Sequence, residues 1–255
     1  MYSNIRLIIE NDYEGMSKKA AAIFGDALKK HPNSAFGFAT GSTPEGMYGE
    51  LVRLHKEEGL DFSGAATFNL DEYHPISRES DQSYYYFMHK MLFNHVNIDK
   101  DRVFLPDGSA QNPELECKEY EEKIKTHGGI ELQILGIGLN GHIGFNEPSD
   151  SFEANTRLVP LTDITINANA RHFADPADVP RHALTMGIRT IMMAKHILFL
   201  ANGEAKAGIL RDAFLGHITP LVPASVLQLH PSVTIVADKK AAAHISSLAE
   251  GAFSV

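Results

Sequence analysis

Cysteine is nearly absent from this sequence of 255 residues, in which Cys117 stands alone. A single cysteine excludes an intrachain disulfide and agrees with the reducing cytoplasm, where we expect this protein to be located. No pattern that stabilises a thiolate surrounds Cys117, so we expect it to serve in packing.

Positive charge is scarce as well, because 23 Lys and Arg stand against 32 Asp and Glu, a formal net charge of −9. Such a field repels polyanions and offers no general basic surface for nucleic acid or an anionic membrane, so an anionic small molecule needs a local site. Long apolar runs are lacking too. Residues 1–20 mix charges with short apolar runs, and we expect neither a signal peptide nor a membrane anchor.

The sequence also lacks internal repeats, low-complexity tracts and Ser/Gly-rich linkers. Hydrophobic residues make up 44% and charged residues 22%, close to the averages of folded proteins, which excludes disordered and fibrous classes. The length allows one large or two small domains, and the missing linker favours a single domain over residues 1–255.

Short β-rich runs alternate with longer helical patterns, which predicts an α/β protein with a mostly parallel sheet. Candidate strands lie at residues 5–9, 35–40, 66–70, 103–105, 132–137, 197–201 and 233–237. Helices are expected at 13–30 and 44–55, and the aromatic run 84–87 is interpreted as part of a core helix rather than a platform for bases. Residues 160–180 have weak periodicity and are expected to form a lid-like excursion.

Residues 36–44 read FGFATGSTP, an apolar strand that turns at Gly41 into a helix. We expect Ser42 or Thr43 as the N-cap and Pro44 in the first turn. The amides and hydroxyls of Gly41, Ser42 and Thr43 at a helix N-terminus suit a phosphate. A capped turn without a ligand is the alternative, since the lysine of a nucleotide P-loop is missing.

Two acidic residues, Asp71 and Glu72, directly follow the candidate strand at 66–70. Ligands bind at the carboxyl ends of parallel strands, so Asp71 is a candidate general base, and Glu72 is expected to point elsewhere. The alternative is that Asp71 simply caps the next helix.

Residues 134–148 read ILGIGLNGHIGFNEP, a buried strand followed by a glycine-rich turn. The turn presents the imidazole of His142 and the carboxylate of Glu147 among many amide donors. The letters at 136, 138 and 141 fit a dinucleotide fingerprint, but no crossover helix follows, so we do not expect NAD. A purely structural histidine is the alternative.

Two cations could complete an anion site: Arg171 in the excursion and Lys206 after the strand at 197–201. Either could be a solvated surface charge, although Lys206 follows a strand end, where the other candidate segments also lie. His-Glu-x-x-His and paired-cysteine patterns are absent, and no metal is expected.

Three segments, ATGSTP at 39–44, NLDEY at 69–73 and GIGLNGHIGFNEP at 136–148, make the chain resemble the glucosamine-6-phosphate deaminase family. The Phe-Asn-Glu-Pro ending separates deaminases from the related 6-phosphogluconolactonases. The resemblance implies a modified Rossmann-like α/β fold, an open sheet with helices on both faces and a mobile lid. It also implies conversion of glucosamine 6-phosphate and water to fructose 6-phosphate and ammonia in amino sugar catabolism, without a cofactor.

The resemblance also implies roles for individual residues. His142, assisted by Glu147 and Asn140, opens the sugar ring, and Asp71 moves the C2 proton to C1. By the same resemblance, the phosphate is held by Gly41, Ser42, Thr43, Arg171 and Lys206.

Two departures from the family pattern carry expectations of their own. Many members have Asp where this chain has Asn140, which can orient an imidazole by hydrogen bonding but cannot stabilise its charged form. The chain ends at Val255, short of the tail of the hexameric, activated members, and Val159 stands where they have a basic residue near Arg157. We therefore expect a monomer or small homo-oligomer that N-acetylglucosamine 6-phosphate does not activate.

Two other functions are disfavoured, because Asp71, His142 and Glu147 are all present. A 6-phosphogluconolactonase needs the His142 loop but no base at Asp71. A sugar-phosphate sensor binds the same ligand but makes no ammonia.

Overall fold

A seven-stranded parallel sheet forms the centre of the computed structural model, which describes residues 4–162, 166 and 179–250. The strand order is β1-β10-β9-β6-β2-β3-β5, and every neighbouring pair is parallel. The strands are β1 (Ile5–Glu10), β2 (Ala35–Phe38), β3 (Ala66–Asn69), β5 (Val103–Phe104), β6 (Ile130–Leu135), β9 (His196–Ala201) and β10 (Val233–Asp238). They match the seven strands expected from the sequence, with ends shifted by at most two residues.

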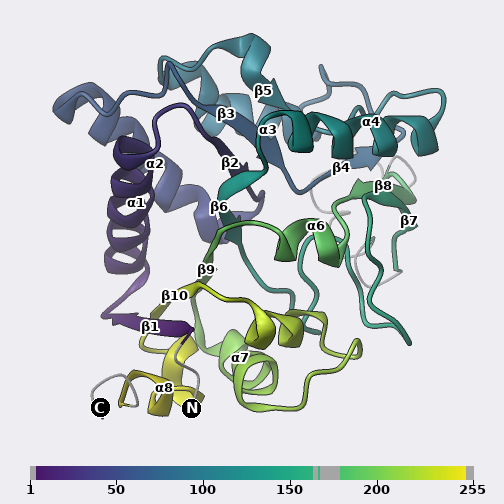
Figure 1. Cartoon of the computed structure of the whole chain (residues 1–255). Coiled ribbons are helices and arrows are strands. Elements are labelled where there is room, and N and C mark those ends of the chain that lie inside the picture. Colours follow the sequence, from purple (N-terminus) through teal and green to yellow (C-terminus); the bar gives the residue numbers. More distant parts are fainter. Residues whose placement is uncertain (1–3, 163–165, 167–178, 251–255) are drawn as a thin grey trace.

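Helices cover both faces of this sheet, as expected (Figure 1). The α-helices are α1 (Tyr13–Lys30), α2 (Ser42–Glu58), α3 (Tyr84–Met91), α4 (Pro113–Thr126), α6 (Ile188–Met192), α7 (Ala207–Leu215) and α8 (Ser247–Glu250). The 3-10 helices are η1 (Phe93–His95), η2 (Lys100–Arg102), η4 (Glu204–Lys206), η5 (Pro223–Leu229) and η6 (Ala241–His244). Helices α1 and α2 lie on one side of the sheet, and α6 and α7 lie on the other.

Aromatic side chains join these helices to the sheet. On the α1 face, the ring of Phe24 lies 5.1 Å from that of Phe36 and 5.3 Å from that of Phe38, both on β2. On the opposite face, Phe199 of β9 meets Phe214 of α7 edge to face at 5.0 Å. The central strands are buried on both faces, which explains why they read as continuous apolar runs in the sequence.

A second sheet, which was not predicted from the sequence, packs beside the first. It is antiparallel in the order β4-β8-β7, with β4 at Asp71–His74, β8 at His182–Thr185 and β7 at Arg157–Pro160. Only Leu70 separates β3 from β4, so the chain passes from one sheet to the other immediately before Asp71. Most of the expected lid at 160–180, Arg171 included, lies outside the described residues.

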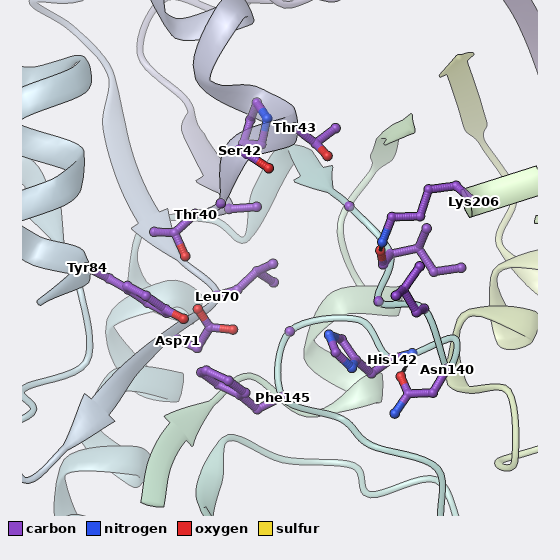
Figure 2. Close-up of a pocket in the computed structure, with 18 residues that line it drawn as sticks. Thr40, Ser42, Thr43, Leu70, Asp71, Tyr84, Asn140, His142, Phe145 and Lys206 are labelled. Atoms are coloured by element: carbon purple, nitrogen blue, oxygen red, sulfur yellow. Dashed lines mark hydrogen bonds between the residues drawn. The ribbon is translucent and has the colours of Figure 1, made fainter. Parts of the chain in front are cut away.

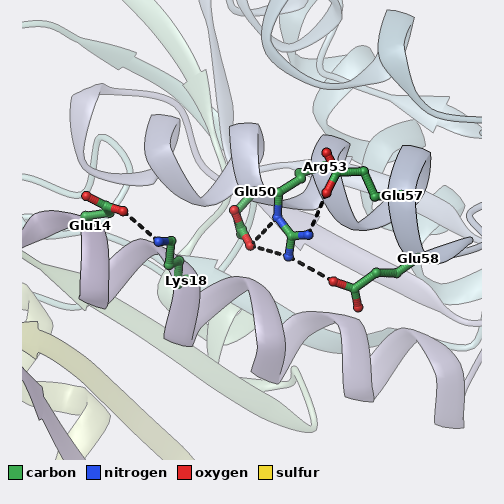
Figure 3. Close-up of polar contacts among 6 residues, drawn as sticks. All are labelled: Glu14, Lys18, Glu50, Arg53, Glu57 and Glu58. Atoms are coloured by element: carbon green, nitrogen blue, oxygen red, sulfur yellow. Dashed lines mark hydrogen bonds and ion pairs between the residues drawn. The ribbon is translucent and has the colours of Figure 1, made fainter.

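The outer surfaces of α1 and α2 carry exposed ion pairs (Figure 3). Arg53 contacts the carboxylates of Glu50, Glu57 and Glu58, and Lys18 contacts Glu14 one turn away. Solvent and salt screen such pairs, so the position of α2 depends on its buried residues instead. Within the described residues, no helix has the length and apolar character needed to cross a membrane.

Candidate active site

A cavity of about 550 Å³ opens where β2, β3, β6 and β9 end (Figure 2). Its walls come from four chain segments that the parallel sheet brings to one edge. The lining residues include Thr40, Gly41, Ser42, Thr43, Leu70, Asp71, Tyr84, Gly138, Asn140, His142, Phe145 and Lys206. All three sequence segments singled out above therefore contribute to one cavity.

The first wall is the N-terminus of α2. Its N-cap is Gly41, with φ at 110°, and no side chain caps the helix, so the expectation of Ser42 or Thr43 as the N-cap is wrong. The positive φ explains the difference, because it is a conformation that glycine adopts far more readily than serine or threonine. The first amides of a helix have no intrahelical partner, and here they adjoin the cavity beside two hydroxyls.

Tyr13 holds this helix end in place from α1. Its hydroxyl donates to the backbone oxygen of Ser42 at 2.9 Å and accepts from the amide of Gly46 at 2.8 Å. A Cβ on Gly46 would come within 2.4 Å of Ser17 Oγ, so glycine permits the close approach of the two helices. The position of the α2 N-terminus is thus set by contacts behind the cavity.

The second wall contains Asp71, which is only 6% exposed. Burial, with a smaller contribution from the charge of Glu72, raises the pKa of Asp71 to about 8. Asp71 follows the parallel strand β3, as predicted, but it also begins β4 of the second sheet. Its carboxylate lies next to Gly144 of the loop that follows β6, where a Cβ would come within 3.2 Å of Asp71 Oδ2.

Glu72 points away from the cavity, as predicted, and caps α3. Its carboxylate accepts hydrogen bonds of 2.9 Å from the amides of Tyr73, Tyr84 and Tyr85. Burial raises the pKa of Glu72 to about 7, while these three hydrogen bonds act in the opposite direction. The carboxyl groups of Asp71 and Glu72 therefore lie on opposite faces of β4, in different surroundings.

The third wall is the loop after β6, which folds tightly around His142. The amide of Gly138 donates to the backbone oxygen of His142 at 3.0 Å, and the amide of Gly141 donates to the oxygen of Gly138 at 3.1 Å. The imidazole lies directly over Gly138, where a Cβ would come within 2.3–2.4 Å of the ring atoms. Glycine at 138 is therefore required for the observed position of the imidazole.

Glu147 lies between Asn140 and His142. Its Oε2 accepts a hydrogen bond of 2.6 Å from Asn140 Nδ2, and its Oε1 is 3.4 Å from His142 Nδ1. The second contact is within ion-pair distance but is not a hydrogen bond, and the buried Nδ1 has no hydrogen-bond partner. Asn140 Oδ1 accepts from the backbone amide of His142 at 3.2 Å, so Asn140 orients the imidazole through Glu147 and the backbone rather than directly.

Lys206 completes the cavity from the loop after β9. Its Nζ donates to the backbone oxygen of Ile137 at 2.6 Å, which ties the β9 loop to the His142 loop. Burial lowers the pKa of Lys206 from its usual value. Of the two predicted cations, the structure places Lys206 at the cavity, whereas Arg171 lies outside the described residues.

Two aromatic residues of the cavity wall were missed. Tyr84 belongs to α3, as predicted, but it lines the cavity instead of serving only as core, and its ring stacks on Phe145 at 6.1 Å between centroids. Phe145 lies within the glycine-rich segment, whose position could have identified it. No sequence signal connects Tyr84 to Asp71, because the link runs through the capping of α3 by Glu72.

Comparisons with known proteins agree with this geometry. The family model of glucosamine-6-phosphate isomerases and 6-phosphogluconolactonases matches residues 13–236. A glucosamine-6-phosphate deaminase of Clostridium botulinum (strain Loch Maree / Type A3) is 52% identical over 242 residues, which are 95% of this chain and 99% of the relative. The corresponding protein of Thermoanaerobacter pseudethanolicus is 53% identical over 241 residues, 94% of this chain and 95% of the relative.

A solved structure of a monomeric glucosamine-6-phosphate deaminase has a TM-score of 0.91 and 44% sequence identity, and the match covers 94% of this chain and 99% of that one. With half of the residues identical over nearly its whole length, the chain belongs to the glucosamine-6-phosphate deaminase family.

Proposed function

We propose that this protein converts glucosamine 6-phosphate and water to fructose 6-phosphate and ammonia in the cavity beside Asp71 and His142. The observation that carries the proposal is that Asp71, His142 and the N-terminus of α2 line one cavity. A proton-transferring carboxyl group, an imidazole and an anion site are the three components that an amino sugar phosphate isomerase needs.

Ring opening is assigned to His142. Its imidazole takes the proton of the C1 hydroxyl and returns one to the ring oxygen, which breaks the C1–O5 bond and leaves an aldehyde. Glu147, 3.4 Å from Nδ1, stabilises the protonated imidazole formed in between, and Asn140 holds Glu147 in that position.

Proton transfer between carbons is assigned to Asp71. The carboxylate removes the weakly acidic C2 proton and returns it to C1, while a proton of the substrate's ammonium group moves to O1, so that the aldehyde becomes a C1 alcohol and C2 becomes an imine. A positioned base contributes about 10²–10⁴-fold to such a step. The substrate's amino group, when protonated, favours the carboxylate form of a residue whose pKa is otherwise raised to about 8. Water then adds to the resulting C2 imine, and ammonia leaves as the C2 ketone forms.

The phosphate is assigned to the first turn of α2, with Gly41, Ser42, Thr43 and Lys206 around it. Backbone amides at the positive end of the helix dipole suit a dianion. Arg171 is proposed as a further phosphate ligand. Binding the remote phosphate orients C1 and C2 between Asp71 and His142, which converts binding energy into rate.

Every step is a proton transfer or the hydrolysis of an imine, so the proposed mechanism uses no redox cofactor and no metal. We also propose a cytoplasmic role in amino sugar catabolism, with the single chain as the active unit. Support for the latter comes from the 44% identical neighbour described as monomeric.

The test is to incubate the purified protein with glucosamine 6-phosphate, without metal or nucleotide, and to quantify ammonia and fructose 6-phosphate together. Equal amounts of both products are expected from the native protein, and neither is expected from Asp71→Asn. Hydrolysis of 6-phosphogluconolactone without ammonia production would instead indicate a lactonase.

A further inference from the structure

A hydrogen bond from the phosphate-facing helix end leads to a residue that the proposed function does not use. Thr43 Oγ1 donates to Asn202 Oδ1 over 2.9 Å, although the two residues are 159 positions apart. Thr43 lies after β2 and Asn202 after β9, with β6 between these two strands in the sheet. This contact is therefore a bridge across the strand that carries the His142 loop.

The backbone on which Asn202 stands is held firmly. Both oxygens of the buried Asp238 carboxylate accept from the amide of Gly203, at 3.1 and 3.0 Å, and Oδ1 also accepts from the amide of Ala241 at 2.7 Å. Gly203 has φ at 86°, the left-handed region that favours glycine. The same loop carries Lys206, which lines the cavity, so one anchored segment holds both the Asn202 amide that contacts Thr43 and the Lys206 ammonium group.

The direction of the Thr43 hydroxyl proton decides what this bridge does for an anion. A threonine hydroxyl has one proton, and in the observed arrangement Asn202 Oδ1 receives it, which leaves only lone pairs for a ligand. An anion needs donors. Rotation of the Asn202 amide by a half-turn about its last side-chain bond places Nδ2 where Oδ1 now lies, and the amide then donates to Thr43 Oγ1.

We infer that Asn202 is a positioning residue for phosphate recognition, which sets the direction of the Thr43 hydroxyl by exchanging the ends of its amide. With Nδ2 donating to Oγ1, the Thr43 proton is free to point at the phosphate beside the amides of α2. An amide suits this role because it offers an acceptor and a donor at almost the same distance. The inference rests on the proposed function only in placing the phosphate at α2.

The experiment compares the native protein with Asn202→Ala, Asn202→Asp, Thr43→Val and the Thr43→Val/Asn202→Ala double variant. Asn33→Ala serves as the matched control, because Asn33 is exposed and precedes β2 at the opposite end of the sheet. Two measurements are made on each protein. One is the KM and kcat for glucosamine 6-phosphate, and the other is the stabilisation by inorganic phosphate in thermal unfolding, which needs no turnover.

For Asn202→Ala we expect KM to rise about tenfold and kcat to stay within about twofold, since a hydrogen bond to a charged group contributes to binding throughout the reaction. The Kd for inorganic phosphate should rise by the same factor. Asn202→Asp should bind the substrate and inorganic phosphate more weakly still, because a carboxylate can only accept the Thr43 proton and also repels the phosphate. In the Thr43→Val background, Asn202→Ala should change KM by less than about twofold.

Native values of KM and phosphate Kd in Asn202→Ala would overturn the inference, and so would additive effects in the double variant or a loss confined to kcat. Absence of any phosphate stabilisation of the native protein would overturn it as well. If the native protein makes no ammonia but Asn202→Ala loses phosphate affinity in the unfolding measurement, the proposed function fails and the inference stands. The unfolding curve without phosphate shows whether each variant is folded.

Discussion

Asn140 donates its side-chain amide to the carboxylate of Glu147 across 2.6 Å, and the other carboxylate oxygen faces His142 Nδ1 at 3.4 Å. The amide therefore holds Glu147 toward the imidazole without adding charge of its own. A carboxylate at position 140 would change this arrangement, since two negative oxygens at that separation repel one another and favour sharing a proton.

Asn140→Asp is expected to retain activity and to move the acid limb of the kcat/KM profile to higher pH. The added negative charge favours proton uptake by the group that the new carboxylate forms with Glu147 and His142, and the proton must leave before His142 acts as a base.

The measurement for Asn140→Asp is kcat/KM for glucosamine 6-phosphate from pH 5 to 9. Asn33→Asp, an exposed site at the far end of the sheet, controls for the change in net charge. A profile that superimposes on that of the native protein would refute a role for residue 140.

Gly138→Ala is expected to lower kcat at least about a hundredfold, because a misplacement of about 1 Å in a reacting group has an effect of that size. The new methyl would lie 2.3–2.4 Å from the His142 ring, so the imidazole must leave its position. Gly49→Ala on α2, where nothing lies within 4 Å of an added Cβ, is the matched control and should keep native kinetics. Equal kcat in Gly138→Ala and the native protein would mean that the imidazole is not needed where it stands.

Asp71→Asn is expected to abolish turnover and to stabilise the fold increasingly as pH rises from about 5 to 8. Because the folded-state pKa of Asp71 is raised from 3.8 to about 8, the folded state binds more protons than the unfolded state in this range. The free energy of unfolding of the native protein therefore falls with rising pH. That of Asp71→Asn does not fall for this reason, because the asparagine amide does not ionise. The gain should level off above about pH 8, at a size on the order of 5 kcal/mol.

The measurement for Asp71→Asn is the difference in Tm between variant and native protein at several pH values. Asp61→Asn is the control of opposite sign, because hydrogen bonding, above all from the Ser63 amide, lowers the pKa of Asp61. Asp61 is ionised in both folded and unfolded states above about pH 5, so its variant should show a constant difference from pH 5 to 8. A Tm difference between Asp71→Asn and the native protein that does not change with pH would contradict a raised pKa of the buried Asp71 carboxyl group.

The parallel sheet could be predicted from the sequence because its central strands are buried on both faces and read as short apolar runs. The second sheet could not. Its strands β4, β7 and β8 are four residues long and pair with segments far apart in sequence, which leaves little periodicity to detect. The opposite directions of Asp71 and Glu72 followed from the alternation of side chains in an extended strand, and the structure confirms them.

The N-cap at Gly41 shows where local preference was overridden. Serine and threonine are favoured caps, yet a glycine with positive φ places Ser42 and Thr43 inside the first turn, next to the cavity. Asn202 was missed for another reason. A polar residue in a loop has no distinctive spacing, and its relation to Thr43 arises only when β9 and β2 are assembled on either side of β6.

The purified protein is expected to be a monomer, with a mass near the 28.0 kDa of one chain. The prediction follows from the proposal that the single chain is the active unit, which the neighbour described as monomeric supports. Light scattering coupled to gel filtration, at several protein concentrations with and without fructose 6-phosphate, measures the mass. A stable mass several times larger at all concentrations would contradict the prediction.

N-acetylglucosamine 6-phosphate is expected not to activate this enzyme. Arg157, on β7, already donates from Nη1 to Asn146 Oδ1 at 2.9 Å, and burial lowers its pKa. Two positions further along the strand, Val159 is buried in an apolar cluster with Tyr73 and Phe145, so no second cation stands beside Arg157 on β7. An activator phosphate at this place would have to break the hydrogen bond between Arg157 and Asn146. Only one partly desolvated cation, Arg157, would then bind the phosphate.

Initial rates as a function of glucosamine 6-phosphate, with and without N-acetylglucosamine 6-phosphate, provide the measurement. Both curves should be hyperbolic with the same half-saturation, apart from competition at the active site at high concentration. Arg157→Lys should leave these curves unchanged in shape, because the residue has a structural partner and no effector. A sigmoidal curve that the compound makes hyperbolic would show that activation needs neither a second cation nor a free Arg157.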